Sequence, residues 1–118
     1  MTEDTHPLGS IEISPNAIAT IASQAVLRSY GVVGMASKNV VVGLAQRLTH
    51  DPRHGVEVLV DGAITINLYI VVEYGTRIST VANSLASTVR FHVERALGMA
   101  VGDINVHVQG LRVSSPDA

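Results

Sequence analysis

Two histidines have the spacing of a metal site. His50 and His54 lie four positions apart, which on a helix would place both imidazoles on one side, where they could bind a metal ion. Pro52 lies between them and disfavours a regular helix, and no third strong ligand is evident. We therefore predict a solvated loop with no metal or cofactor. Together with Arg47 and Arg53, these histidines form the chain's only concentration of basic side chains, a candidate docking loop for an acidic partner.

A second motif has the form of a nucleic-acid clamp. The segment Gly31-Val32-Val33-Gly34 matches the Gly-x-x-Gly loop with which KH domains hold a nucleic-acid backbone. Both middle residues are valine, no Lys or Arg flanks the motif closely, and aromatic residues make up only 3% of the chain. We predict a turn followed by the start of a strand. A KH-like nucleic-acid-binding module remains an alternative function.

Catalytic groups are sparse. No serine lies in a Gly-x-Ser-x-Gly elbow, and the chain has no cysteine. Glu57 and His107 share the exposed phase of two predicted strands, where a carboxylate and an imidazole could act as acid and base. Without a third group or a cleft, we interpret them as surface residues and predict that the protein is not an enzyme. A small uncharacterised enzyme is the other alternative.

Composition restricts the classes of partner. The chain has 118 residues, enough for one domain with its own core, and a formal net charge of -2 gives no overall attraction to nucleic acid or anionic lipid. The acidic start lacks the features of a signal peptide, and no apolar run approaches the roughly 20 residues of a spanning helix. We expect a cytoplasmic protein without direct membrane insertion or nucleic-acid binding. Residues 9–113 form the predicted domain, between a disordered tail at 1–8 and a second tail at 114–118.

The helices and strands that position these groups are predicted from hydrophobic periodicity and from the residues that start or end a helix. Ser14-Pro15 is typical of a helix start, because serine accepts hydrogen bonds from first-turn amides and proline has no donor to lose there. Gly31 marks the end of that helix. Residues 40–48 form either a short helix or an irregular connection. The predicted strands cover 10–13, 32–36, 56–60, 64–72 and 103–109, and a second helix covers about 77–97.

The hydrophobic alternation sets a register for the central hairpin. A two-residue turn at Asp61-Gly62 would split the apolar residues between two faces. Pairing Val60 with Ile64 keeps them together and implies a turn of three or five residues. In the last strand the alternation changes phase after Gly110, as a β-bulge requires.

The second predicted helix presents one long apolar stripe. Its members recur three or four positions apart and are Ile78, Val81, Ala82, Leu85, Val89, Val93 and Ala96. At 1.5 Å per residue the helix is roughly 30 Å long, about as long as the strand before it. We therefore predict a two-layer α/β (α+β) domain in the order βαβββαβ. Its sheet is mixed or antiparallel, with two long helices on one face.

The other face of the sheet is the candidate interaction surface. Strand alternation places Leu59, Tyr69 and Val71 on it among polar residues, with His107 at their rim. Apolar and aromatic side chains within a polar surround are typical of a protein interface. We predict that these four residues contact protein partners, including other copies of the chain.

Four segments resemble the alkaline shock protein 23 family of bacterial envelope stress response proteins. The specific ones are Leu-Tyr-Ile-Val-Val-Glu-Tyr-Gly, ending at Gly75, and Asn-Val-His-Val-Gln-Gly, ending at Gly110. Gly9 to Pro15 and Gly31 to Met35 are compatible but generic, and the connection from Ala36 to Gly55 departs from the lysine-rich form of many relatives. The resemblance implies a non-enzymatic α/β protein linked to cell-envelope stress. It also implies, in some bacteria, a separate membrane-anchor protein as partner. We therefore expect a scaffold or adaptor that forms homo-oligomers and binds proteins.

Overall fold

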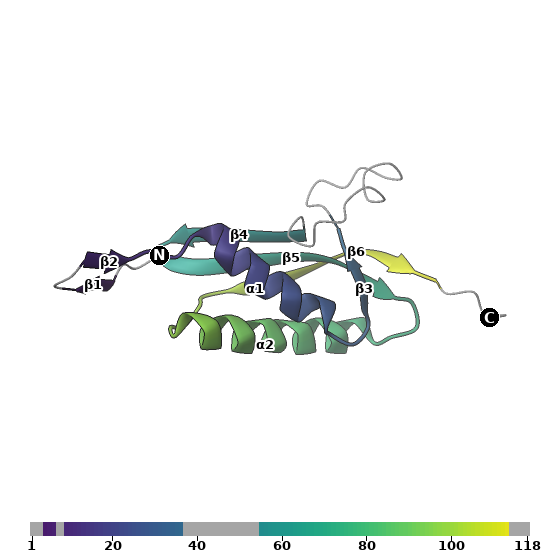
Figure 1. The fold of residues 1–118 in the computed structure, drawn as a ribbon. Helices are drawn as coiled ribbons and strands as arrows, with labels where there is room; N and C mark the ends of the chain where they lie inside the picture. The colour runs from purple at the N-terminus through teal and green to yellow at the C-terminus, as the bar shows by residue number, and fades with distance from the viewer. Residues whose placement is uncertain (1–3, 7–8, 37–54, 114–118) are drawn as a thin grey trace.

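The structure, a computed structural model, describes residues 4–6, 9–36 and 55–113 (Figure 1). The elements in chain order are β1 (Asp4–His6), β2 (Gly9–Ile11), α1 (Pro15–Leu27), β3 (Val32–Met35), β4 (Val56–Asp61), β5 (Ala63–Glu73), α2 (Ile78–Leu97) and β6 (Ile104–Arg112). The predicted order βαβββαβ is confirmed from β2 onward, and β1 precedes it.

The main sheet is built around β5. Strands β3 and β4 pair with β5 antiparallel, and β6 pairs with it parallel, so the sheet is mixed. β4 pairs along 63–68 and β3 along 70–72, while β6 pairs along 66–73. The stretch of β5 that pairs with β6 includes residues that also pair with β4 and residues that also pair with β3. Strands β3 and β4 must therefore both lie along the other edge of β5, one after the other.

Ala36 and Gly55, the described residues on either side of 37–54, both lie against Tyr69 at this edge. The N–H of Ala36 donates to the backbone oxygen of Tyr69 at 2.8 Å. A Cβ added to Gly55 would lie 2.8 Å from the same oxygen and 2.7 Å from the Cβ of Met35. Glycine is therefore required at position 55, because the backbones are too close for a side chain. The helix or irregular connection predicted for 40–48 lies outside the described residues.

The β4–β5 hairpin has the predicted register. Val60 pairs with Ile64, Val58 with Ile66 and Val56 with Leu68. Gly62 has φ +76 and lies between the paired residues Asp61 and Ala63, which makes a three-residue turn. The prediction that rejected the two-residue turn is confirmed.

Helix α1 begins as its sequence predicts. The Ser14 hydroxyl accepts a hydrogen bond from the Ala17 N–H at 3.2 Å, and proline occupies the first turn. The helix ends at Leu27, a few residues before Gly31. Gly31 has φ +86, and a Cβ there would lie 2.8 Å from Cγ2 of Val81 on α2. This glycine therefore permits both the turn into β3 and the close approach of α2.

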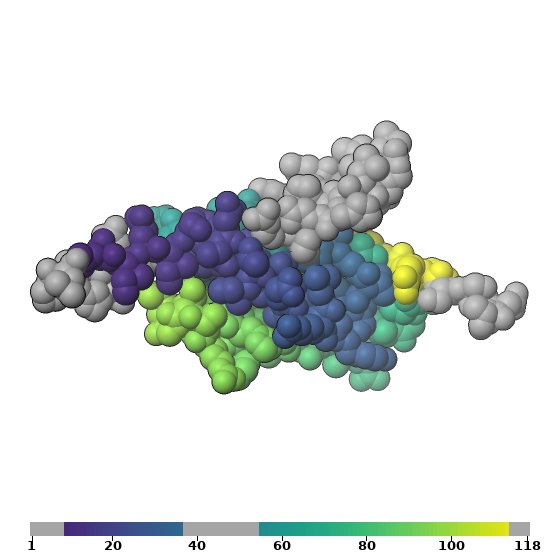
Figure 2. All heavy atoms as spheres, in the orientation of Figure 1, coloured from purple at the N-terminus to yellow at the C-terminus, as the bar shows by residue number. Residues whose placement is uncertain are grey.

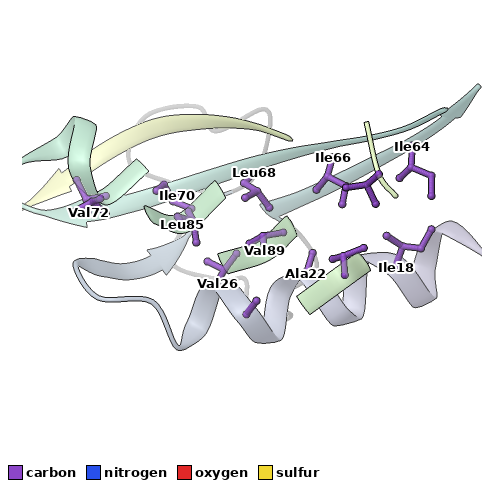
Figure 3. Packing of buried hydrophobic residues seen from close by; sticks show 14 residues of the cluster. Ile18, Ala22, Val26, Ile64, Ile66, Leu68, Ile70, Val72, Leu85 and Val89 are labelled. Carbon is purple, nitrogen blue, oxygen red and sulfur yellow. The ribbon is translucent and has the colours of Figure 1, made fainter. Parts of the chain in front are cut away.

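Both helices cover one face of the sheet, where the core forms (Figure 3). Alternate residues of β5 meet the buried side of each helix. The cluster contains Ile18, Ala22, Ala25 and Val26 from α1, Ile64, Ile66, Leu68, Ile70 and Val72 from β5, Val81, Leu85, Val89 and Val93 from α2, and Val101. The inward phase of β5 and most of the α2 stripe are confirmed. Ile78 and Ala96, the two end members of the predicted stripe, lie exposed at the two ends of α2 and are not part of the core.

The connection from α2 to β6 is fixed by two charged side chains. Arg90 donates from Nη1 to the Val101 carbonyl at 3.0 Å and from Nη2 to the Gly102 carbonyl at 2.9 Å. The Glu94 carboxylate accepts from the Val101 N–H at 2.9 Å and lies 3.4 Å from Nη1 of Arg90. The pair satisfies backbone groups of this loop that lie outside the regular ladder of the sheet.

Along β6, the register shifts between Val108 and Gly110, which confirms the predicted bulge.

The first residues differ from the predicted tail. Asp4–His6 pairs antiparallel with Gly9–Ile11, so β1 and β2 form a separate two-stranded sheet that projects from one end of the molecule (Figure 1). Residues 4–6 are thus paired in the structure, and the disordered tail expected at 1–8 stays a prediction. The strand predicted at 10–13 pairs within this hairpin rather than with the main sheet. The predicted limits of the domain, 9–113, stay a prediction.

Candidate functional site

The sheet face turned away from α1 and α2, here called the outer face, carries the candidate site. Its side chains come from the odd phase of β4, β5 and β6. They are Glu57, Leu59, Thr65, Asn67, Tyr69, Val71, Glu73, Asn105, His107 and, after the bulge, Arg112. The parallel pairing of β5 with β6 brings residues about 38 positions apart into contact, as the hydrogen bond between Asn67 and Asn105 illustrates.

A row of hydrogen bonds crosses three strands. Asn105 donates from Nδ2 to Oδ1 of Asn67 at 2.9 Å, and Asn67 donates from Nδ2 to Oε1 of Glu57 at 3.1 Å. The central amide, that of Asn67, is fixed at both its oxygen and its nitrogen, so it holds the side chains on either side in one orientation. Such a fixed polar row presents a defined pattern of donors and acceptors to a partner.

An aromatic pair lies beside this row. The rings of Tyr69 and His107 are stacked, with centroids 4.6 Å apart and planes 12° apart. The Tyr69 hydroxyl also lies 3.5 Å from Oε1 of Glu57. Only 8% of Tyr69 is exposed, so the expectation of an exposed tyrosine is wrong. The reason is the register of β6, which places His107 directly opposite Tyr69.

The two apolar residues stand at opposite ends of the outer face. Leu59 is 49% exposed and pairs with Thr65, whereas Val71 is half-buried and pairs with Gly110 beside the bulge. Along β5 the two pairs are six residue positions apart, roughly 20 Å. The polar row and the stacked rings lie between them. The surface is therefore mixed in character and is not one apolar patch.

An ion pair closes the far end of the outer face. Arg112 donates from Nε and Nη2 to Oε1 of Glu73 at 3.3 and 3.1 Å. Arg112 is largely exposed, so this pair contributes little to stability. It fixes the end of β6 against β5 and places a cation next to the bulge.

The remaining candidate residues have other surroundings. The Gly31–Gly34 motif is not an open loop, because Val32–Met35 is strand β3 paired with β5. Glu57 and His107 share the outer face, and each has a contact with Tyr69. The docking-loop residues Arg47, His50, Arg53 and His54 lie outside the described residues.

Metal ligands do not cluster in the described residues. Within 4–6, 9–36 and 55–113, no group of three or more His, Cys, Asp or Glu side chains could hold a metal ion. Neither helix in the described part of the chain is long and apolar enough to cross a membrane.

Sequence prediction missed the polar row. Asn67 and Asn105 have the same strand phase, and that shared phase was the available signal. Their pairing depends on a parallel register that the sequence does not specify. The same register explains why the burial of Tyr69 was missed.

Comparison with known proteins agrees with the resemblance seen in the sequence. Residues 3–113 match the model of the alkaline shock protein 23 family, described as having a cell envelope-related function. The uncharacterised protein YloU of Bacillus subtilis is 43% identical over 111 residues, covering 92% of each chain. The uncharacterised protein Spy1614 of Streptococcus pyogenes is 35% identical over 108 residues, covering 89% of each chain. YqhY of Bacillus subtilis, also uncharacterised, is 36% identical over 112 residues, covering 93% of this chain and 82% of its own. No solved structure matches.

Proposed function

This chain belongs to the alkaline shock protein 23 family, whose function is cell envelope-related, and from that premise we propose that it is a non-enzymatic scaffold or adaptor of the bacterial cell envelope. It acts in the cytoplasm by self-association and by binding other proteins in response to envelope stress. A membrane-anchor protein is the partner class that the family resemblance implies. No arrangement in the described residues points to catalysis.

The observation that carries the proposal is the ordered outer face. The Glu57–Asn67–Asn105 row and the Tyr69–His107 stack fix their side chains before any partner binds. These side chains then lose little entropy when a partner docks, which favours affinity on a polar surface. Non-obligate interfaces have this mixture of polar and apolar area.

The sheet face that α1 and α2 cover forms the core, whereas the outer face has no covering layer among the described elements. Leu59 offers an apolar side chain at one end, and Val71 offers part of one at the other. These two residues flank the polar row and define the limits of the proposed contact surface. Tyr69 contributes by supporting His107 rather than by direct contact.

Light scattering tests self-association through this surface. We expect the parent protein to have at least twice the 12.4 kDa mass of one chain, and the double variant Leu59→Lys, Val71→Lys to shift towards the monomer. Tyr30→Lys, at an exposed residue after α1, is the control and should keep the parent mass. A monomeric parent, or a double variant with unchanged mass, would refute self-association by the outer face.

A further inference from the structure

A groove with an apolar and basic lining lies on the side of the molecule opposite to the outer face. Helices α1 and α2 lie side by side on the surface in Figure 2, and a hollow of about 550 Å³ lies between them. Its apolar lining includes Ile21, Ala25 and Ala96, and its basic lining consists of Arg28, His92 and Arg95. The small alanines leave the space between the helices unfilled, which makes this a hollow rather than a packed seam.

The charge in this groove is unbalanced. Among the described residues, no Asp or Glu lines it, although the chain as a whole has a formal net charge of -2. Two arginines elsewhere in the described chain lie beside carboxylates: Arg90 against Glu94, and Arg112 against Glu73.

The two guanidinium groups that line the groove differ in their surroundings from those of Arg90 and Arg112. Within the described part of the chain, neither Arg28 nor Arg95 forms an ion pair. Arg95 instead lies over the ring of Phe91, with its Cζ 5.8 Å from the ring centroid. That cation–π contact holds the guanidinium near the ring, and its N–H groups are still able to bind a carboxylate.

We propose that the α1–α2 groove binds an acidic amphipathic helix of a partner protein. The apolar lining takes the hydrophobic stripe of the helix, and Arg28 and Arg95 pair with carboxylates beside that stripe. The lining runs from Thr20 on α1 to Arg28 at the C-cap of this helix, which at 1.5 Å per residue is about 12 Å, or two turns of a docked helix. A hollow of this shape suits a ridge of side chains better than a flat lipid surface. A phosphate backbone would leave the apolar lining uncovered.

Synthetic peptides test the groove directly. The probe is a helical peptide of about fourteen residues with leucines on one stripe, glutamates flanking it and alanines elsewhere. A matched peptide carries lysine in place of every glutamate. Fluorescence anisotropy measures affinity, and amide chemical shifts of the isotope-labelled protein locate the contact.

We expect the acidic peptide to bind and to shift the amides of Ile21, Ala25 and Ala96. The double variant Arg28→Glu, Arg95→Glu should weaken this binding by at least about tenfold and should bind the lysine peptide instead. Arg77→Glu, outside the groove, is the control and should retain the parent affinity. Unperturbed spectra elsewhere in each variant establish that it is folded.

Three results would overturn the proposal. The first is an acidic peptide that leaves the groove amides unshifted, and the second is a double variant that binds it as tightly as the parent. The third is a shift of these amides by polyuridylate or by phosphatidylserine vesicles in place of the peptide. The groove and the outer face lie on opposite sides, so Leu59→Lys, Val71→Lys should leave peptide binding intact. Either proposal can therefore fail without the other.

Discussion

The imidazole of His107 lies flat against the ring of Tyr69, with the two centroids 4.6 Å apart. One residue is on β6 and the other on β5, so their contact depends on the parallel pairing of these strands. The two partners differ in exposure: Tyr69 is buried beneath, while His107 remains exposed and available to a partner.

Removing the imidazole should expose the tyrosine. The chain has three tyrosines and no tryptophan, so in a Tyr30→Phe, Tyr74→Phe background Tyr69 is the only strong fluorophore. We expect His107→Ala in this background to increase acrylamide quenching of Tyr69 fluorescence and to cost about 0.5–1.5 kcal/mol of stability. Asn105→Ala, in the neighbouring row, is the control that should leave quenching unchanged. Equal quenching in all three proteins would mean that His107 does not shield Tyr69.

Gly55 should tolerate no side chain. An added Cβ would lie 2.7 Å from the Cβ of Met35 and 2.8 Å from the Tyr69 carbonyl oxygen, and backbone atoms cannot yield cheaply. We expect Gly55→Ala to lower the free energy of unfolding by about 1–3 kcal/mol. Gly34→Ala is the matched control, because a Cβ there meets nothing within 4 Å. If urea titration gives the same loss for both variants, the close approach at position 55 is not what limits stability.

Truncating Leu85 should lower stability more than truncating any other side chain of α2. Its side chain is 0% exposed and packs within the core cluster. We expect Leu85→Ala to cost about 2–5 kcal/mol, measured from the denaturation midpoint. Ser87→Ala, at an exposed position of the same helix, should change stability by less than about 0.5 kcal/mol. An unchanged midpoint for Leu85→Ala would contradict the described packing.

Arg90 should stabilise the loop before β6 through its backbone contacts. Replacing it by methionine removes the donors to the Val101 and Gly102 carbonyls while keeping an apolar stem of similar length. We expect a loss of about 1–3 kcal/mol and faster amide exchange in residues 98–103. Arg95→Met, the control, removes a cation from the same helix without removing such hydrogen bonds. Matching exchange rates in the two variants would show that the contacts of Arg90 are dispensable.

Local signals in the sequence predicted most of the fold. The Ser14-Pro15 start of α1 and the glycine in the central turn depend on backbone chemistry that a short segment determines. The register of β4 on β5 followed from keeping the apolar residues on one face. These features need no knowledge of distant contacts.

The details of the outer face depended on contacts between distant segments. Nothing local to β5 indicates that β6 runs parallel to it with His107 opposite Tyr69. Alternation therefore assigned Tyr69 to the correct face but could not predict that a neighbouring ring would cover it. The unbalanced groove between α1 and α2 was missed for the same reason, because Arg28 and Arg95 are far apart in sequence.

Site-specific photo-crosslinking in living bacteria is the most direct test of the outer face as a protein-binding surface. A photoreactive amino acid replaces Leu59 in one strain and Tyr30, which is exposed beside the start of α2, in another. We predict a discrete crosslinked product from position 59 that contains a second copy of this chain or an envelope protein and changes in yield under envelope stress. Position 30 should give none of this product. No product from position 59, or the same product from both positions, would contradict the account.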